Sequence, residues 1–145
     1  MVWKLDPSHS EITFSVKHMM ISQVTGTFTS FKAALEIEEN HPERCWVEAA
    51  VEAASITTHH EQRDAHLRSS DFLEVDHYPL ITFKSQKVER REERLYRMWG
   101  DLSMHGRTKE VIFTVEYAGQ INQDPGGYQR AGLSAVTTIN RKDLV

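Results

Sequence analysis

The sequence predicts an all-β protein with one helix, folded as an antiparallel β-barrel in a single domain over residues 1–145. Three observations predict this class. Long segments alternate apolar and polar residues with a period of two, which is typical of strands with one dry face. Short turns connect these segments and indicate antiparallel neighbours. A long sheet with one apolar face loses its exposed edges when its first and last strands pair, so a barrel is the expected arrangement.

The first two strands are expected over residues 9–20 and 23–39. In the first, one face carries Ile12, Phe14, Val16, His18 and Met20. His18 is therefore an inward histidine on an otherwise apolar face. In the second, the apolar parity changes between Phe28 and Phe31, which predicts a β-bulge near Ser30.

Five further strands are expected over residues 45–56, 80–89, 94–105, 109–120 and 129–140. The first of these has several inward alanines, which leave volume inside a barrel that larger side chains would fill. The inward faces of the five strands carry Val51, Phe83, Tyr96, Met98, Leu102, Met104, Phe113, Val115, Tyr117 and Leu133.

One polar segment interrupts the strands and is rich in good helix formers, which predicts a helix over residues 58–69. Thr58 followed by Glu61 predicts a capping box at its start. Helical spacing places His59, Arg63, His66 and Leu67 on one face.

Composition limits the possible partners and compartments. The net charge is −4 and the basic residues are scattered, so no nucleic-acid partner is expected. No apolar run approaches the roughly 18 residues of a membrane span. The N-terminus shows no signal-peptide pattern, which favours the cytoplasm, or the periplasm if a leader was removed. The single cysteine, Cys45, excludes an internal disulfide and is expected to be an inert residue at the start of a strand.

Three functions remain open from the residues alone. The inward apolar side chains could hold an apolar ligand or simply fill a core. His60 and Asp64, at positions i and i+4, could offer two metal ligands, although Arg63 beside them would repel a cation. His18 or His105 could act as an acid–base catalyst, but no complete nucleophile or metalloprotease motif is present.

Several segments in order resemble the YceI-like family of polyisoprenoid-binding, lipocalin-like proteins. They are WKLDPSHSEITFSVKH at 3–18, the VxGxFxxF pattern at 24–31, RDAHLRSSDFLEV at 63–75, YPLITF at 78–83, GDLSMHGRTK at 100–109 and INRKD at 139–143. The family pattern continues beyond INRKDFG with a final strand, whereas here the sequence reads INRKDLV. The resemblance therefore implies a lipocalin-like barrel that is incomplete or open, short of its last strand.

The resemblance implies a binding protein, not an enzyme, with a long isoprenoid or similar amphiphilic lipid in an apolar tunnel and no other cofactor. By this resemblance, the inward strand residues form the wall of the tunnel and the helix forms its mouth. The predicted ligand-binding residues are Phe14, Val16, His18, Phe28, Val51, Arg63, His66, Leu67, Phe83, Met98, Leu102, Met104, Phe113, Val115 and Leu133. Arg63, His66 and His18 are expected to contact a polar head group, since an arginine fork suits phosphate. An open seam between strands would also allow a homodimer.

Overall fold

A computed structural model describes residues 2–18, 22–121, 125–126 and 129–145. The described strands are β1 (Val2–Lys4), β2 (Ile12–His18), β3 (Ser22–Phe28), β4 (Phe31–Glu36), β5 (Trp46–Glu52), β6 (Ile56–Thr57), β7 (Leu80–Glu92), β8 (Leu95–Met104), β9 (Arg107–Ile121) and β10 (Arg130–Val136). The α-helix is α1 (Glu61–Arg68), and the 3₁₀ helices are η1 (Pro7–His9), η2 (Pro42–Arg44), η3 (Ala53–Ser55) and η4 (Arg141–Asp143).

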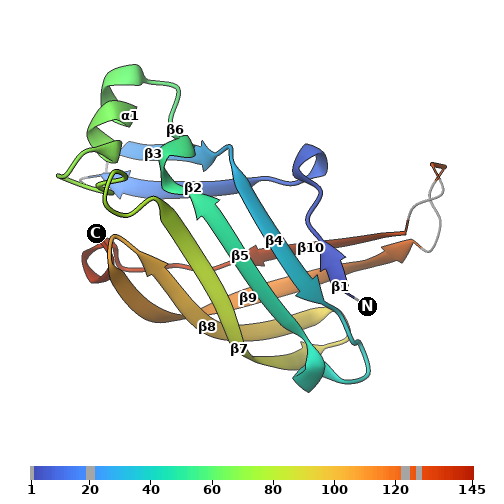
Figure 1. The fold of residues 1–145 in the computed structure, drawn as a ribbon. Helices are drawn as coiled ribbons and strands as arrows, with labels where there is room; N and C mark the ends of the chain where they lie inside the picture. The colour runs from blue at the N-terminus through green and yellow to red at the C-terminus, as the bar shows by residue number, and fades with distance from the viewer. Residues whose placement is uncertain (1, 19–21, 122–124, 127–128) are drawn as a thin grey trace.

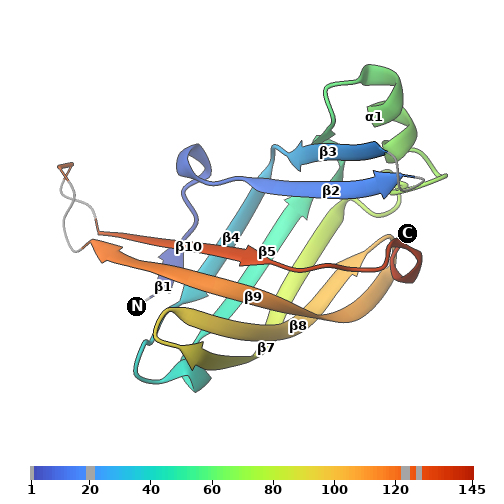
Figure 2. The same ribbon diagram turned by 180° about the vertical axis from the view of Figure 1, so that it is seen from behind.

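The strands form two antiparallel sheets. Seven strands pair in the order β1-β4-β5-β7-β8-β9-β10, and the other three pair in the order β2-β3-β6. The larger sheet is strongly curled into a half-barrel, and β2 and β3 lie across one of its ends beside α1 (Figures 1 and 2). The predicted antiparallel β architecture with one α-helix is confirmed. Within the described residues, β2 and β10 are edge strands.

The predicted bulge near Ser30 is wrong, because the chain changes sheets at that point. β3 pairs with β2 and β6 in the small sheet, whereas β4 pairs with β1 and β5 in the large one. Thr29 donates its N–H to the Ser55 carbonyl, and Ser30 accepts a hydrogen bond from the N–H of Glu52. The change of parity in the sequence therefore records two strands with different partners, not one bent strand.

Cross-strand register brings apolar side chains onto the inner face of the curled sheet. Residues directly opposite each other in a ladder point to the same face. Ala49 lies opposite Phe83, Phe83 opposite Leu102, and Met98 opposite Phe113. Two buried clusters result, one around Val51, Ala53 and Ile81 and one around Phe83, Met98 and Val111.

Gly100 of β8 has no side chain, which allows the Phe83 ring and the backbone of Lys84 on β7 to pack closely against it. A Cβ at this position would lie 2.5 Å from both the Lys84 carbonyl oxygen and the ring of Phe83. We expect Gly100→Ala to lower the free energy of unfolding by about 2 kcal/mol, because either the strand or the ring must move. Urea denaturation would measure the loss. Gly132→Ala is the matched control, since among the described residues its Cβ would meet Ala118 alone, at an ordinary 3.5 Å. Equal stability of the two variants would contradict this account.

Candidate ligand-binding site

The structure gathers eight of the predicted ligand-binding residues in or against the two buried clusters. They are Phe28, Val51, Phe83, Met98, Leu102, Met104, Phe113 and Val115. Leu102 packs against both clusters and so joins them into one apolar surface. Phe83 and Phe113 meet edge to face with ring centroids 5.0 Å apart, and Phe14 contacts Phe28 at 5.5 Å. Together these residues form a continuous apolar lining on the inner face.

Part of this lining is accessible. Leu102, Met104, Phe113 and Val115 are only half-buried. Two predicted residues are more exposed than an interior position would be, Val16 at 40% and Leu133 at 43%. The reason is their place on the edge strands β2 and β10, each of which pairs on one side only within the described residues. A ligand on the inner face could therefore reach apolar side chains from the centre of the sheet to its edges.

The predicted capping box at the start of α1 is wrong. The helix begins at Glu61, and its N-cap is His60, whose Nδ1 accepts a hydrogen bond from the N–H of Arg63 at 3.1 Å. Thr58 instead donates its backbone N–H and its hydroxyl to Asp64 Oδ1, at 2.8 and 2.5 Å. The Asp64 carboxylate therefore accepts both donors of Thr58. In a capping box, the Thr58 N–H would instead have donated to the Glu61 side chain.

Arg63 turns back onto the same loop. Its Nε donates to Thr58 Oγ1 at 2.8 Å, and its Nη2 donates to the Thr58 carbonyl at 3.2 Å. Part of the guanidinium fork is thus used to hold the helix entry. The expected contact between Arg63 and a lipid head group stays a prediction, and it would have to use the remaining N–H donors.

His66 and Leu67 lie apart from the two apolar clusters. His66 is exposed, approaches Asp71 Oδ2 at 2.9 Å through Nε2, and packs edge to face on Phe72. Leu67 is half-buried in the helix, and its carbonyl accepts from the N–H of Leu73. The side chain of His18 lies outside the described part of the chain. The structure thus groups most of the apolar site residues, and it places Arg63 and His66 in contacts with their own loop.

Asp64 fixes the helix entry, and its charge should matter for stability. Burial alone raises the pKa of Asp64, but the hydrogen bonds from Thr58 outweigh that effect and hold the pKa below its usual value. A lowered pKa in the folded state means that the stabilisation is present above the unfolded-state pKa and is lost as pH falls through the folded-state value. We expect Asp64→Ala to cost about 2 kcal/mol at pH 7. The loss should shrink as pH falls below about 4.

Urea unfolding of wild type and Asp64→Ala at pH 7 and at pH 3 would measure this effect. Asp64→Asn is the control, because it keeps an acceptor for Thr58 without the charge and should lose less stability. A penalty for Asp64→Ala that stays constant across this pH range would show that the ionised carboxylate is not the stabilising group.

The candidate metal and acid–base residues are engaged in local contacts. His60 caps the helix and Asp64 binds Thr58, so the two proposed ligands already have protein partners. In the described ranges, no group of three or more histidine, cysteine or acidic side chains is placed to hold a metal ion. His105 Nε2 lies 3.5 Å from Glu74 Oε2, and Glu74 Oε1 also contacts His77 Nδ1 at 2.7 Å.

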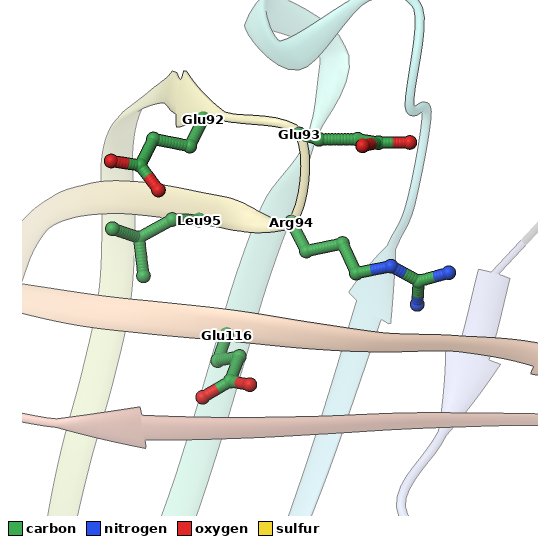
Figure 3. A pocket seen from close by; sticks show the side chains of 5 residues that line it. All are labelled: Glu92, Glu93, Arg94, Leu95 and Glu116. Carbon is green, nitrogen blue, oxygen red and sulfur yellow. The ribbon is translucent and has the colours of Figure 1, made fainter.

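A pocket of about 300 Å³ lies at the β7–β8 hairpin (Figure 3). Its walls are Glu92, Glu93, Arg94, Leu95 and Glu116. The walls are mostly charged, and none of the predicted ligand-binding residues is among them. This pocket therefore does not suit the apolar part of a lipid.

Two tyrosines near the same hairpin belong to the inner face. Tyr96 lies opposite Val115, and Tyr117 lies opposite Leu133. Both are buried, and burial raises the pKa of each phenol. The sequence pattern placed them inward but did not mark them as site residues, because alternation gives the face of a residue and not its hydrogen-bond partners. Burial likewise raises the pKa of the Cys45 thiol, whose sulfur accepts from the N–H of Glu38 and donates to its carbonyl.

The curled sheet with its apolar inner face and single helix defines a half-barrel of the lipocalin-like class. A family model described as the YceI-like domain matches residues 3–144, and the chain belongs to this family. The resemblance noted in the sequence is thereby confirmed. The described residues include no helix long and apolar enough to cross a membrane.

The relatives include UPF0312 proteins. The chain is 35% identical over 136 residues to that of Ectopseudomonas mendocina (strain ymp), covering 94% of this chain and 71% of the relative. It is 35% identical over 144 residues to that of Pseudomonas putida (strain GB-1), covering 98% and 74%.

The similar solved structures include YceI proteins. The Campylobacter jejuni YceI protein matches with a TM-score of 0.73 and 29% identity, over 90% of this chain and 76% of that one. Burkholderia cenocepacia BcnA matches with a TM-score of 0.75 over 79% of this chain and 71% of that one. Its identity is 20%, so that match bears on the fold alone.

Proposed function

We propose that this protein binds a long-chain isoprenoid or a similar amphiphilic lipid along the inner face of the curled sheet, for carriage, storage or sensing. The observation that carries this proposal is the continuous apolar lining formed by the two clusters and their half-buried neighbours. Burial of apolar surface would drive binding, at about 25 cal/mol per Å² before the costs of association.

A binding role suits the contacts of the polar side chains better than catalysis does. Asp6, Ser8 and His9 have the composition of a catalytic triad, but Ser8 Oγ and Asp6 Oδ2 both approach the same nitrogen, His9 Nδ1. A triad needs its base to use one nitrogen for each partner. Asp6 also accepts hydrogen bonds from the backbone and hydroxyl of Ser8, so this cluster caps η1.

Native mass spectrometry and organic extraction of the purified protein would test lipid binding. We expect a long-chain lipid in near-stoichiometric amount, or uptake of added isoprenoid by delipidated protein. Protein that is empty as purified and ignores added isoprenoids would refute the proposal. A metal-dependent or histidine-based enzyme, the alternative from the sequence, would instead require turnover that is lost in His60→Ala or His105→Ala.

A homodimer through the open edges is a second candidate. Val16 on β2, and Leu133 and Val136 on β10, are exposed apolar residues on edge strands. Exposed strand edges with apolar side chains are ready templates for pairing with another chain. Light scattering across a concentration series would detect such a dimer, and a constant monomer mass at high concentration would exclude it.

A further inference from the structure

Arg107 and Lys109 of β9 lie on the same face of the sheet as the apolar lining. Lys109 is directly opposite Leu102, and Arg107 is directly opposite Met104. Directly opposed residues of two strands point to the same face. Leu102 packs against both apolar clusters, and Met104 packs against one of them. The two cations therefore continue the row of lining residues towards the turn between β8 and β9.

A contact on the other face of this hairpin supports the assignment. Ser103 Oγ and Thr108 Oγ1 are 2.8 Å apart, so the two hydroxyls share one face. Successive side chains of a strand alternate between faces, which places Arg107 and Lys109 on the face opposite to these hydroxyls. Both cations are exposed at the end of the lining, so a ligand that lies on the inner face can reach them.

The contacts of the two cations leave their charge available to an anion. Arg107 donates from Nη1 to the Lys142 carbonyl at 3.3 Å, and a carbonyl carries no net charge. Lys109 Nζ lies 3.9 Å from Asp143 Oδ2, and both side chains are exposed. An exposed ion pair at this distance is weak, so an anionic group of a ligand can replace Asp143. Arg141 and Lys142 precede Asp143 in η4, so this segment carries more positive than negative charge.

The other end of β8 is acidic. The pocket at the β7–β8 hairpin has three carboxylates in its walls, those of Glu92, Glu93 and Glu116. Its arginine, Arg94, donates to the carbonyl of Ala118 at 2.7 Å. Like charges repel, so an anionic group is disfavoured at this hairpin. At the β8–β9 turn, the carboxylate of Glu74 is already in contact with His77 and His105. The charges along the sheet therefore favour an anion beside Arg107 and Lys109.

We infer that Arg107 and Lys109 form the polar end of the lipid site and bind an anionic group of the ligand, a phosphate or a diphosphate. This inference rests on the proposed lipid binding and assigns the ligand class and its direction on the sheet. The hydrocarbon lies along the apolar clusters, and the anionic group lies at the β8–β9 turn. An arginine fork and a lysine ammonium are the side chains that bind phosphate in proteins. Arg63 and His66 of α1, in contrast, hold their own loop.

Titrations with geranylgeranyl diphosphate, geranylgeraniol, the hydrocarbon phytane and inorganic diphosphate test the inference. We expect wild type to bind the lipid diphosphate more tightly than the alcohol, by a margin that shrinks as salt screens the charges. Lys109→Met and Arg107→Gln should each weaken binding of the lipid diphosphate about fivefold to tenfold. Both should bind the alcohol and phytane as wild type does. Inorganic diphosphate should bind more weakly than the lipid diphosphate, because it has no hydrocarbon to bury.

Lys84→Met is the matched control. Lys84 lies opposite Asp101 on the outer face of β7, and its side chain is 77% exposed. This variant loses the same charge as Lys109→Met without changing the inner face, so it should bind all four probes as wild type does. Lys109→Arg keeps the charge and should keep the preference for the lipid diphosphate. Because Arg107 also holds the Lys142 carbonyl, phytane affinity reports whether Arg107→Gln leaves the lining intact.

Four results would overturn the inference. The first is a wild type with no preference for the lipid diphosphate over the alcohol. The second is unchanged diphosphate binding by the double variant Arg107→Gln/Lys109→Met. The third is an equal loss for diphosphate, alcohol and phytane in both single variants, which would show that the two residues only support the fold. The fourth is inorganic diphosphate that binds as tightly as the lipid diphosphate. Failure of all three lipid probes to bind wild type would overturn the proposed function as well.

Discussion

Replacing Leu133 by glutamate is expected to weaken isoprenoid binding at least about 30-fold while the protein stays folded. Leu133 is on the inner face opposite Tyr117, and at 43% exposed it contributes little to the core. In the complex, the new carboxylate would be trapped against hydrocarbon, and an unpaired polar or charged group there costs about 2 kcal/mol or more. Fluorescence or calorimetric titration with geranylgeraniol would measure the loss.

Thr114→Glu is the matched control for this substitution. Thr114 is exposed on the outer face, where it lies opposite Arg97, so a carboxylate there meets solvent and an opposite charge. The control should bind the alcohol as wild type does. Equal affinities for Leu133→Glu and wild type, with lipid binding intact, would place the ligand somewhere other than the inner face.

The sequence predicted the lining because strand alternation is a local property. Each inward residue of β7, β8 and β9 could be assigned to a face by parity alone, and the register then set Phe83, Leu102 and Met98 beside their neighbours. Parity does not say which strands are neighbours. The change of parity at Ser30 was therefore read as a bulge, when it marks the passage of the chain from one sheet to another.

The helix shows a different limit. Its composition predicted a helix in the right place, but the choice of cap depended on a competition between Glu61 and Asp64 for donors of Thr58. The outcome depends on the backbone before the helix, where β6 is extended and His59 has a positive φ of 60°. Helix propensities of single residues do not encode this backbone path. The expected head-group contacts of Arg63 and His66 depended on the same geometry, and both side chains turn towards their own loop.

Leu144 lies in the short segment around η4, where sequence pattern gives no sign of a core residue. It is nevertheless fully buried, with 0% exposure. Side chains from distant elements hold this segment in place. Arg107 donates to the Lys142 carbonyl at 3.3 Å, Lys109 approaches Asp143 at 3.9 Å, and the guanidinium of Arg141 lies over the Phe72 ring. These exposed contacts are individually weak, so the buried leucine should provide most of the docking energy.

We therefore expect Leu144→Ala to lower the free energy of unfolding by about 3 kcal/mol, the usual cost of deleting a buried leucine side chain. Urea denaturation would measure the change. Ile139→Ala is the matched control, because Ile139 precedes the same segment but is 38% exposed, and it should cost less than about 1 kcal/mol. If η4 docks through its charges instead, Arg107→Ala would destabilise the protein more than Leu144→Ala does, and the segment would be held by its surface contacts rather than by its apolar anchor.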